Sequence, residues 1–353
     1  MARRGAPKTV RAERGSRTGA ALLAEIAEHP EDDDLRQVYA DHLIERGDPR
    51  GELIMLQLSG SDPKRERKLL EQHARSWLGS LAPLARDWRH YRFERGFPVA
   101  IQLCEHSPAA LERTIGDPIW STVTHLYLFS EAALPTALVR HPTMRSLQHL
   151  GGLSRTTLRE LLGWDEVPYA TLNVFIADPD FDESAARANL EALTSGQTKL
   201  AHLRALELHT RNIEPSDFRW LWRSWLGRQL DAFGAECGLD RLGAWIPELD
   251  KHAKHLRSVT LSTENLWVEQ VELTRDDRGR FSLAEVRSWD PSQRFWTITP
   301  RLPAIISNLP RGALTRLRFI GGAPMPRQLA AIKDACLAAK VALELPTASR
   351  GSR

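Results

Sequence analysis

A short apolar pattern recurs through most of this chain. One apolar residue is followed three positions later by a second and usually, two positions further on, by a third, as in Leu203-x-x-Leu206-x-Leu208. Neighbouring copies start 22 to 34 positions apart, except for one interval of 58 positions, which equals two steps of 29. Such repetition is typical of stacked units that are each too small to bury their own apolar face. It therefore indicates an extended surface built from repeats. The seven copies begin at Val123, Leu147, Tyr169, Leu203, Leu230, Leu256 and Leu314.

The segments between these copies carry helix-start signals. Short strands that alternate with helices, without a dinucleotide-type glycine motif, predict an α/β fold with parallel strands. The geometry resembles a degenerate leucine-rich repeat, although most units lack the Asn or Cys expected after the strand. We therefore expect an irregular solenoid of strand–helix units over residues 104–346. Proline opens the predicted helices at Ser107-Pro108, Leu134-Pro135, Glu214-Pro215 and Met325-Pro326.

The interval of 58 positions holds additional residues. Val268–Leu273 and Arg280–Val286 alternate in polarity and flank Asp276-Asp277-Arg278-Gly279, which is a favourable turn sequence. Two interpretations are open: a β-hairpin inserted near residues 266–288, or a unit whose strand lies near Leu283. Insertions in a solenoid usually form surface loops, often on the binding side.

Residues 19–103 have a mainly helical pattern. An apolar stripe ends at Pro30, and a second helix is predicted from about Asp32 to Arg46. Residues 31–34 are acidic, which favours the start of this helix over a metal site, because the helix dipole attracts negative charge there. Further helices are predicted after Asp48-Pro49 and Asp62-Pro63, and a strand pair at residues 90–103.

One long motif in this region is specific. It reads Arg36-x-Val38-Tyr39-Ala40-Asp41-x-Leu43-x-Glu45-Arg46-Gly47-Asp48-Pro49-Arg50-Gly51-Glu52. The motif resembles the bacterial repeat-companion domain, a short helical module found beside leucine-rich and other repeats. The resemblance covers roughly residues 20–103, and Trp77-Leu78-Gly79 and Arg95-Gly96-Phe97 are similar to the family's continuation into its repeats. It implies a partner module for repeats and no known catalytic activity.

The turn inside this motif invites a structural hypothesis. Gly47 ends one helix, and Asp48 and Pro49 start the next. On a helical wheel Arg46 projects toward the apolar face, unlike Arg36 and Glu45. We expect Arg46 to pair with Asp48 or Glu52 and to fix the angle between the two helices. The alternative is an exposed docking patch made of Asp41, Arg50 and Glu52.

The residues between the apolar positions are candidates for partner binding. In a strand, alternate side chains point to opposite faces, so these residues face the exposed surface if the repeated apolar residues point inward. Neighbouring rings of Tyr127, Phe129 and Phe175 would merge into one aromatic patch. The alternative is that these rings contact the N-terminal module or a helix. The candidates are Tyr127, Phe129, Asn173, Phe175, Glu207, His209, Glu236, Thr260, Ser262 and Arg318.

Aromatic residues are concentrated in residues 218–226. At helical spacing Phe218, Trp222 and Trp225 share a face, which predicts a core position, while Trp220 points nearly opposite. Trp220 is therefore either an exposed anchor for a partner or a residue buried against an adjoining repeat.

Composition and motifs argue against several classes of protein. The chain has no stretch of 18 apolar residues, and its three cysteines form no C-x-x-C pair, which favours a cytoplasmic protein with reduced thiols. The net charge of +3 conceals a basic tail, since residues 1–17 carry six basic residues against one acid. Such a tail is typical of a disordered terminus. No P-loop, nucleophile elbow or metal-ligand spacing is present; His252 and His255 fit surface histidines better than a metal pair.

We therefore expect a non-enzymatic scaffold that needs no cofactor and binds a protein partner on the exposed strand face. The alternative is a nucleic-acid-associated protein tethered by residues 3–17. The expected organisation is a basic tail at residues 1–18, a helical module at 19–103, a solenoid at 104–346 and a second tail at 347–353. The partner and the oligomeric state are left open.

Overall fold

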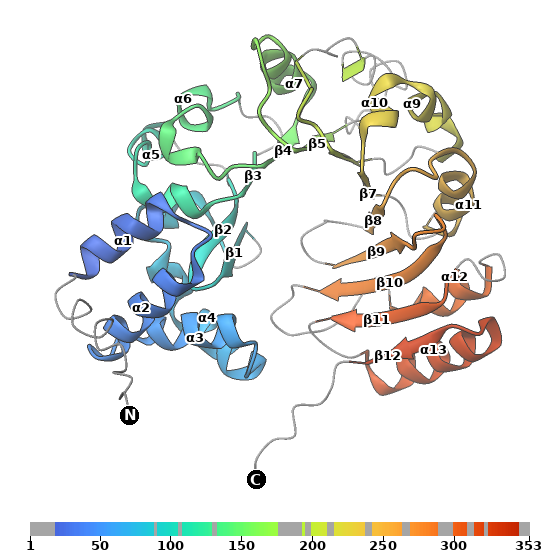
Figure 1. The fold of residues 1–353 in the computed structure, drawn as a ribbon, viewed down its shortest axis with the longest axis horizontal. Coiled ribbons are helices and arrows are strands. Elements are labelled where there is room, and N and C mark those ends of the chain that lie inside the picture. The colour runs from blue at the N-terminus through green and yellow to red at the C-terminus, as the bar shows by residue number, and fades with distance from the viewer. Residues whose placement is uncertain are drawn as a thin grey trace, which may run out of the picture.

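The chain forms an arch in which a curved sheet is covered by helices on its outer side (Figure 1). This computed structural model describes residues 18–87, 90–104, 108–128, 133–175, 193–194, 199–209, 215–236, 242–262, 269–288, 299–308, 314–320 and 324–345. The fold is mixed α/β, and the sheet is open, with β1 and β12 at its two edges. The prediction of an α/β fold with mainly parallel strands is confirmed.

Twelve strands follow one another across the sheet in chain order. Strands β2 to β8 are parallel, and so are β10 to β12, whereas the pairs β1–β2, β8–β9 and β9–β10 are antiparallel. The strands are β1 Tyr91–Glu94, β2 Phe97–Gln102, β3 His125–Tyr127, β4 His149–Leu153, β5 Thr171–Phe175, β6 Ala205–His209, β7 Ala232–Glu236, β8 Ser258–Ser262, β9 Glu269–Arg275, β10 Phe281–Ser288, β11 Arg316–Ile320 and β12 Ala342–Glu344.

Short helices connect the parallel strands. Several begin at or just after the prolines that predict them, because proline lacks the amide hydrogen that a first helical turn leaves unpaired. They are α5 Pro108–Glu112, η3 Pro118–Thr122, α6 Thr136–Val139, η4 Pro142–Met144, α7 Arg155–Leu162, η5 Pro215–Phe218, α9 Arg219–Arg223, α10 Trp225–Gln229, α11 Leu242–His252, α12 Leu302–Asn308 and α13 Pro326–Ala339.

The repeated apolar residues form the layer between sheet and helices. The central residue of each copy is in register with that of the next, from Leu126 on β3 through Leu172 to Val259 on β8. All of these side chains are buried in one continuous core. At about 25 cal/mol per Å² of apolar area removed from water, this layer is the main source of stability. The triplets are therefore core positions.

The 58-residue interval contains strands β9 and β10, which form an antiparallel hairpin. Gly279 adopts a left-handed φ of 71°, and its amide donates to Asp276 O, which closes the turn. Strand β9 also pairs with β8, and β10 pairs in parallel with β11. The expectation of a surface loop is wrong, because the hairpin lies within the sheet and continues it.

The N-terminal region packs four helices at one end of the arch (Figure 1). Asp32, Asp48 and Asp62 accept hydrogen bonds from amides of the first turns of α2, α3 and α4, and therefore act as N-caps. A small separate core includes Leu22, Tyr39, Ile54 and Phe97. The helices are α1 Gly19–Glu28, α2 Asp33–Ile44, α3 Pro49–Ser59 and α4 Pro63–Trp77, followed by the 3₁₀ helix η1 Gly79–Leu84.

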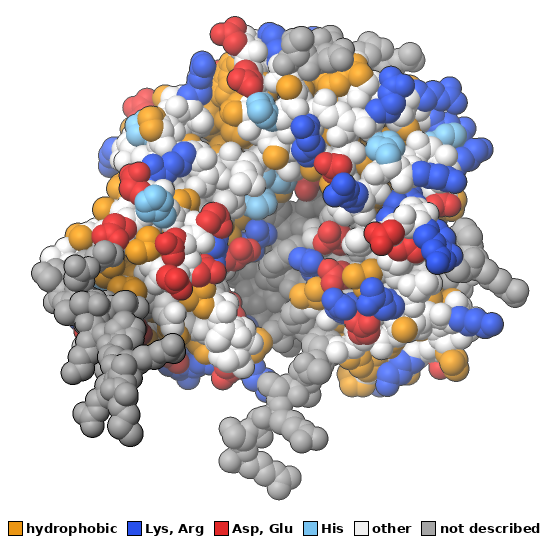
Figure 2. Space-filling view, in the orientation of Figure 1, with side chains coloured by type: hydrophobic (Ala, Val, Ile, Leu, Met, Phe, Trp, Pro, Cys, Tyr) orange, Lys and Arg blue, Asp and Glu red, His pale blue; other side chains and the backbone are white. Residues whose placement is uncertain are grey.

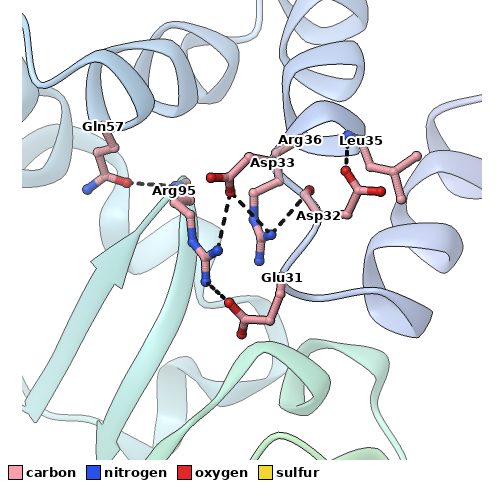
Figure 3. A network of polar contacts seen from close by, with 8 residues as sticks. Glu31, Asp32, Asp33, Leu35, Arg36, Gln57 and Arg95 are labelled. Atoms are coloured by element: carbon pink, nitrogen blue, oxygen red, sulfur yellow. Dashed lines mark hydrogen bonds and ion pairs between the residues drawn. The ribbon is translucent and has the colours of Figure 1, made fainter.

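Helix α3 joins this small core to the sheet. The Gln57 amide donates to Phe93 O at 3.0 Å, and its carbonyl oxygen accepts from Gly96 N at 2.6 Å. Gly96 has a φ of 79°, and a Cβ there would lie 2.1 Å from Ile54 Cγ1, so only glycine fits. Beside this turn, Arg95 pairs with Glu31 at 3.1 Å and with Asp33 at 3.2 Å (Figure 3).

The hypothesis for Arg46 is wrong. Arg46 is exposed, and no ion pair joins it to Asp48 or Glu52, all of which lie in the described part of the chain. Both oxygens of Glu52 instead accept from Arg65 at 2.6 Å, because α4 brings that guanidinium alongside α3. The prediction for Arg36 is also wrong, since this side chain is 1% exposed.

The alternative of an Asp41–Arg50–Glu52 docking patch fails because of Arg50. Its Nε donates to Gly96 O at 2.9 Å, and its guanidinium lies over the Phe97 ring, 4.5 Å from the centroid. Arg36 also approaches Phe97, at 5.4 Å. The Phe97 ring on β2 thus holds two arginines inward. A helical wheel for residues 33–46 cannot predict this, because Phe97 lies on a different element.

Candidate functional site on the inner face of the sheet

One row of residues crosses the inner face, opposite the apolar core. The strand register places Asn173, Glu207, Gly234 and Thr260 side by side on β5 to β8. The row continues through Glu272, Glu285, Arg318 and Glu344 on β9 to β12. Charged side chains gather around the central hollow of the molecule (Figure 2). The inner face is therefore polar along most of its length.

Glu207 is the centre of the first polar group on this face. Asn173 Nδ2 donates to Glu207 Oε2 at 3.0 Å, and Tyr127 Oη donates to the same oxygen at 3.4 Å. His149 Nε2 lies 3.5 Å from it. We call Tyr127, His149, Asn173 and Glu207 the glutamate cluster. It joins side chains from β3, β4, β5 and β6, and it forms because alternate residues of parallel strands share a face.

The histidines at the edge of this cluster are buried. His125 and His149 stack with ring centroids 5.0 Å apart, and the Tyr127 ring lies 4.8 Å from that of His149. Burial is the main cause that lowers the pKa of His149 to about 3, and the positive charge of Arg92 adds to it. Burial, His149 and Arg92 lower the pKa of His125 to about 2. Both imidazoles are therefore neutral near pH 7.

Glycine allows the inner face to pack this tightly. A Cβ on Gly151 would lie 2.4 Å from Tyr127 Cδ1, and one on Gly234 would lie 2.7 Å from Glu207 Cγ. Side chains on the concave side of a curved sheet converge, so a small neighbour is needed where a large one leans across. Gly151 and Gly234 are the neighbours in register with Tyr127 and Glu207.

A second polar group occupies strands β9 to β12. Arg318 donates to Glu344 at 2.7 Å and to Glu285 at 3.2 Å. Arg287 pairs with Glu285 at 2.6 Å and with Glu272 at 3.3 Å. We call these five residues the charge ladder. The Glu344 and Glu285 carboxylates raise the pKa of Arg318 above its ordinary value. Because each arginine has two acidic neighbours, the ladder fixes the side chains without a large net charge.

The predicted binding residues fall into three groups. Tyr127, Asn173 and Ser262 point away from the apolar core but are buried, which contradicts their expected exposure. Glu207, Thr260 and Arg318 are partly exposed, as predicted for this face. Four other predicted residues lie outside the described part: Phe129 and the side chains of Phe175, His209 and Glu236. The aromatic patch therefore stays a prediction at Phe129 and Phe175. At Tyr127 the prediction of an exposed ring is wrong, because this residue is buried.

Trp220 lies on the outer side of the molecule among the connecting helices. It is half-buried and packs against the main core, which supports the second interpretation of its role. The predicted single helix breaks at Ser224, whose Oγ accepts from Gly227 N at 3.1 Å. Trp225 is half-buried, packs against the main core and donates from its indole nitrogen to Thr194 O at 2.7 Å.

Sequence reasoning missed His125, His149, Glu272, Glu285 and Arg287. A signal for the histidines was present, since His125 is two residues before Tyr127 and His149 two before Gly151, and period two places them on the same face. The three charged residues lie on the hairpin, for which the repeat pattern gives no register.

Two further kinds of site, membrane spans and metal centres, concern the described residues as a whole. Across them, no helix combines the length and apolar character that a membrane span requires. Nor do these ranges contain a group of three or more His, Cys, Asp or Glu side chains arranged to hold a metal ion. His252 instead lies 3.3 Å from Glu248, and His255 contacts Gly227 O at 2.5 Å.

The fold defines a mixed α/β protein made of repeated strand–helix units around an open, mostly parallel sheet. No family model matches the chain, and no curated protein sequence is significantly similar to it.

Proposed function

We propose that this chain is a non-enzymatic, cytoplasmic scaffold that binds a protein partner on the inner face of its sheet. In this proposal the strand–helix units form an irregular solenoid related to leucine-rich repeats, and residues 19–103 are a bacterial repeat-companion module that covers its first edge. The observation that carries the proposal is the row from Asn173 to Glu344, polar except at Gly234, on the side of the sheet away from the connecting helices.

Asn173, Gly234 and Glu285 in this row are buried, but the exposure of other members supports partner binding. Arg318 and Glu344 keep 39% and 37% of their side chains exposed, and Thr260 is half-buried. The ion pairs of the charge ladder hold its side chains in place before any partner arrives. A preorganised surface loses less conformational entropy on association than a flexible one.

The chemistry of the glutamate cluster favours a structural role over catalysis. A general base works best when its pKa is near the working pH. The pKa of His149 at about 3 is far below that range. The cluster is therefore better suited to hold four strands in a fixed curvature than to transfer protons.

Affinity capture from native lysate tests the inner face. We compare the wild type with Thr260→Arg, which places a long side chain on the half-buried floor, and with Arg318→Glu, which reverses a partly exposed charge. Lys333→Glu on the exposed side of α13 is the matched control. We expect both inner-face variants to lose a protein that the wild type and the control retain. Equal recovery by all four proteins, each with a native circular dichroism spectrum, contradicts the proposal.

The second candidate function is nucleic-acid association through residues 3–17, favoured by the six basic residues there. Binding of a short DNA duplex should then weaken steeply as salt rises, because each phosphate contact releases counterions. Removal of residues 1–17 should abolish this binding. Equal binding by the shortened chain excludes the tail as the nucleic-acid contact.

A further inference from the structure

Two stacked histidines lie on the inner face of the sheet, near the Asn173 end of the polar row. His125 and His149 are register partners on β3 and β4, and His149 is 5% exposed. His149 Nε2 is buried and has no hydrogen-bond partner among the described atoms. His125 Nδ1 is 2.8 Å from the Thr124 hydroxyl. The two rings are therefore packed against each other in the interior, and the Glu207 carboxylate lies 3.5 Å from His149 Nε2 without a hydrogen bond of good geometry.

Among the described residues, the charged groups that face the pair come from two other strands. Arg92 on β1 is close enough for its positive charge to oppose protonation of both rings. Glu207 on β6 favours protonation of His149, but its nearest oxygen already accepts from Tyr127 and Asn173. Among the described side chains of β5, the one that contacts Glu207 is Asn173, whose amide is uncharged. Burial and Arg92 therefore outweigh the single carboxylate.

We infer that the His125–His149 stack is an acid-sensitive latch that holds β3 and β4 in the curved sheet at neutral pH and releases them when the imidazoles take up protons. The latch regulates the inner face, so its consequence for a partner rests on the proposed function. The latch itself is a property of the free protein and is tested without any partner.

The direction of the pH effect follows from burial. The ordinary pKa of histidine, 6.5, applies to rings freed into water, and the folded values are about 2 and about 3. Above pH 6.5 both states are neutral and pH has little effect. As pH falls below 6.5, only the open state gains protons, so the folded arrangement loses stability. At pH 5 each freed ring favours opening by about 30-fold, and two independent rings by about 1,000-fold.

Hydrogen exchange measures this opening directly. We compare protection factors at pH 7.5 and pH 5.0. A protection factor divides the intrinsic exchange rate at each pH by the observed rate, so the intrinsic pH dependence of exchange cancels. We expect amides of β3 and β4 to lose at least 30-fold in protection at pH 5.0 while β11 and β12 change less than threefold. The double variant His125→Gln/His149→Gln should lose this pH response. Glu207 is unchanged in this variant, so a lost response is due to the histidines. The control His202→Gln, an exposed ring paired with Glu166, should respond like the wild type.

Two outcomes overturn the latch. One is wild-type protection of β3 and β4 that does not change between pH 7.5 and 5.0. The other is an unchanged pH response in the double variant. If that variant does not fold, nuclear magnetic resonance titration of the wild-type imidazoles decides: rings that stay neutral down to the pH of opening support the latch, and rings that titrate near 6.5 in the folded protein refute it.

Discussion

Tyr127 illustrates how single residues on the inner face have roles that the repeat pattern does not assign. The period-two rule places it correctly on that face, but its ring is 9% exposed and stacks on His149. It is therefore part of the packing of the sheet, and a partner would meet little of it. Removal of the ring is therefore expected to lower the free energy of unfolding, whatever it does to partner binding.

We predict different effects for two substitutions of Tyr127. Tyr127→Phe keeps the ring and removes the hydroxyl that donates to Glu207 at 3.4 Å, which should cost about 1 kcal/mol. Tyr127→Ala removes the ring over Gly151 and should cost about 3–5 kcal/mol. Urea unfolding of both variants measures these values. Equal costs would show that the ring does not pack as described.

Gly234 should be coupled energetically to Glu207. A Cβ at position 234 would lie 2.7 Å from Glu207 Cγ, and overpacking of this kind costs about 1–3 kcal/mol. Gly234→Ala should therefore destabilise the wild type but have a smaller effect in a Glu207→Ala background. A double-mutant cycle gives the coupling free energy. A coupling free energy of zero would contradict the close contact between Glu207 and Gly234.

At the scale of elements, α3 is the link between the N-terminal helices and the sheet. Its Leu53 belongs to the main core, while the adjacent Ile54 belongs to the small one. Gln57, on the same helix, donates to Phe93 O on β1 and accepts from Gly96 N in the turn between β1 and β2. The helix therefore fixes the position of the first strand pair.

Gln57→Ala should weaken this link. The change leaves Phe93 O and Gly96 N without their side-chain partner, at a cost of about 1–3 kcal/mol. Hydrogen exchange at the Gly96 amide should accelerate as well. Gln72→Ala, at an exposed position of α4, is the control and should change the free energy of unfolding by less than about 0.5 kcal/mol. An effect of similar size at both positions contradicts the proposed link.

The sequence predicts elements better than it predicts side-chain environments. The triplet pattern predicts strands β3 to β8 and β11, because each strand must bury one face whatever its neighbours are. It does not predict that Asn173 is buried, since that depends on Glu207 reaching across from the next strand. Arg36 is buried, contrary to expectation, for the same reason, because the Phe97 ring that it approaches lies on another element.

At the scale of the molecule, the two edges of the sheet are unequal. Helix α3 and its neighbours cover the β1 edge through Gln57, and Arg145 on the repeat side pairs with Glu28 of α1 at 3.1 Å. At the other edge β12 is only three residues long, which limits the strand edge offered to another chain. The N-terminal helices therefore close one end of the repeated units.

Truncation tests this closing role. A chain of residues 104–353 lacks Leu53, Trp77 and Phe93 from the main core and exposes the edge of β3. We expect it to aggregate or to unfold without cooperativity, as repeat arrays without a terminal cap do. Removal of residues 1–17 alone should leave the unfolding midpoint unchanged. A monomeric 104–353 fragment with native near-ultraviolet circular dichroism would contradict the role of the cap.

Site-specific photo-crosslinking provides the decisive test of partner binding on the inner face. A photoreactive residue at Ser258, half-buried in the sheet on the same face as Thr260, is compared with one at Lys333, exposed on α13. In native lysate we expect Ser258 to capture a discrete protein that Lys333 does not capture. Capture of that protein from Lys333 alone, with none from Ser258, would place the binding surface on the helices and contradict the proposed function.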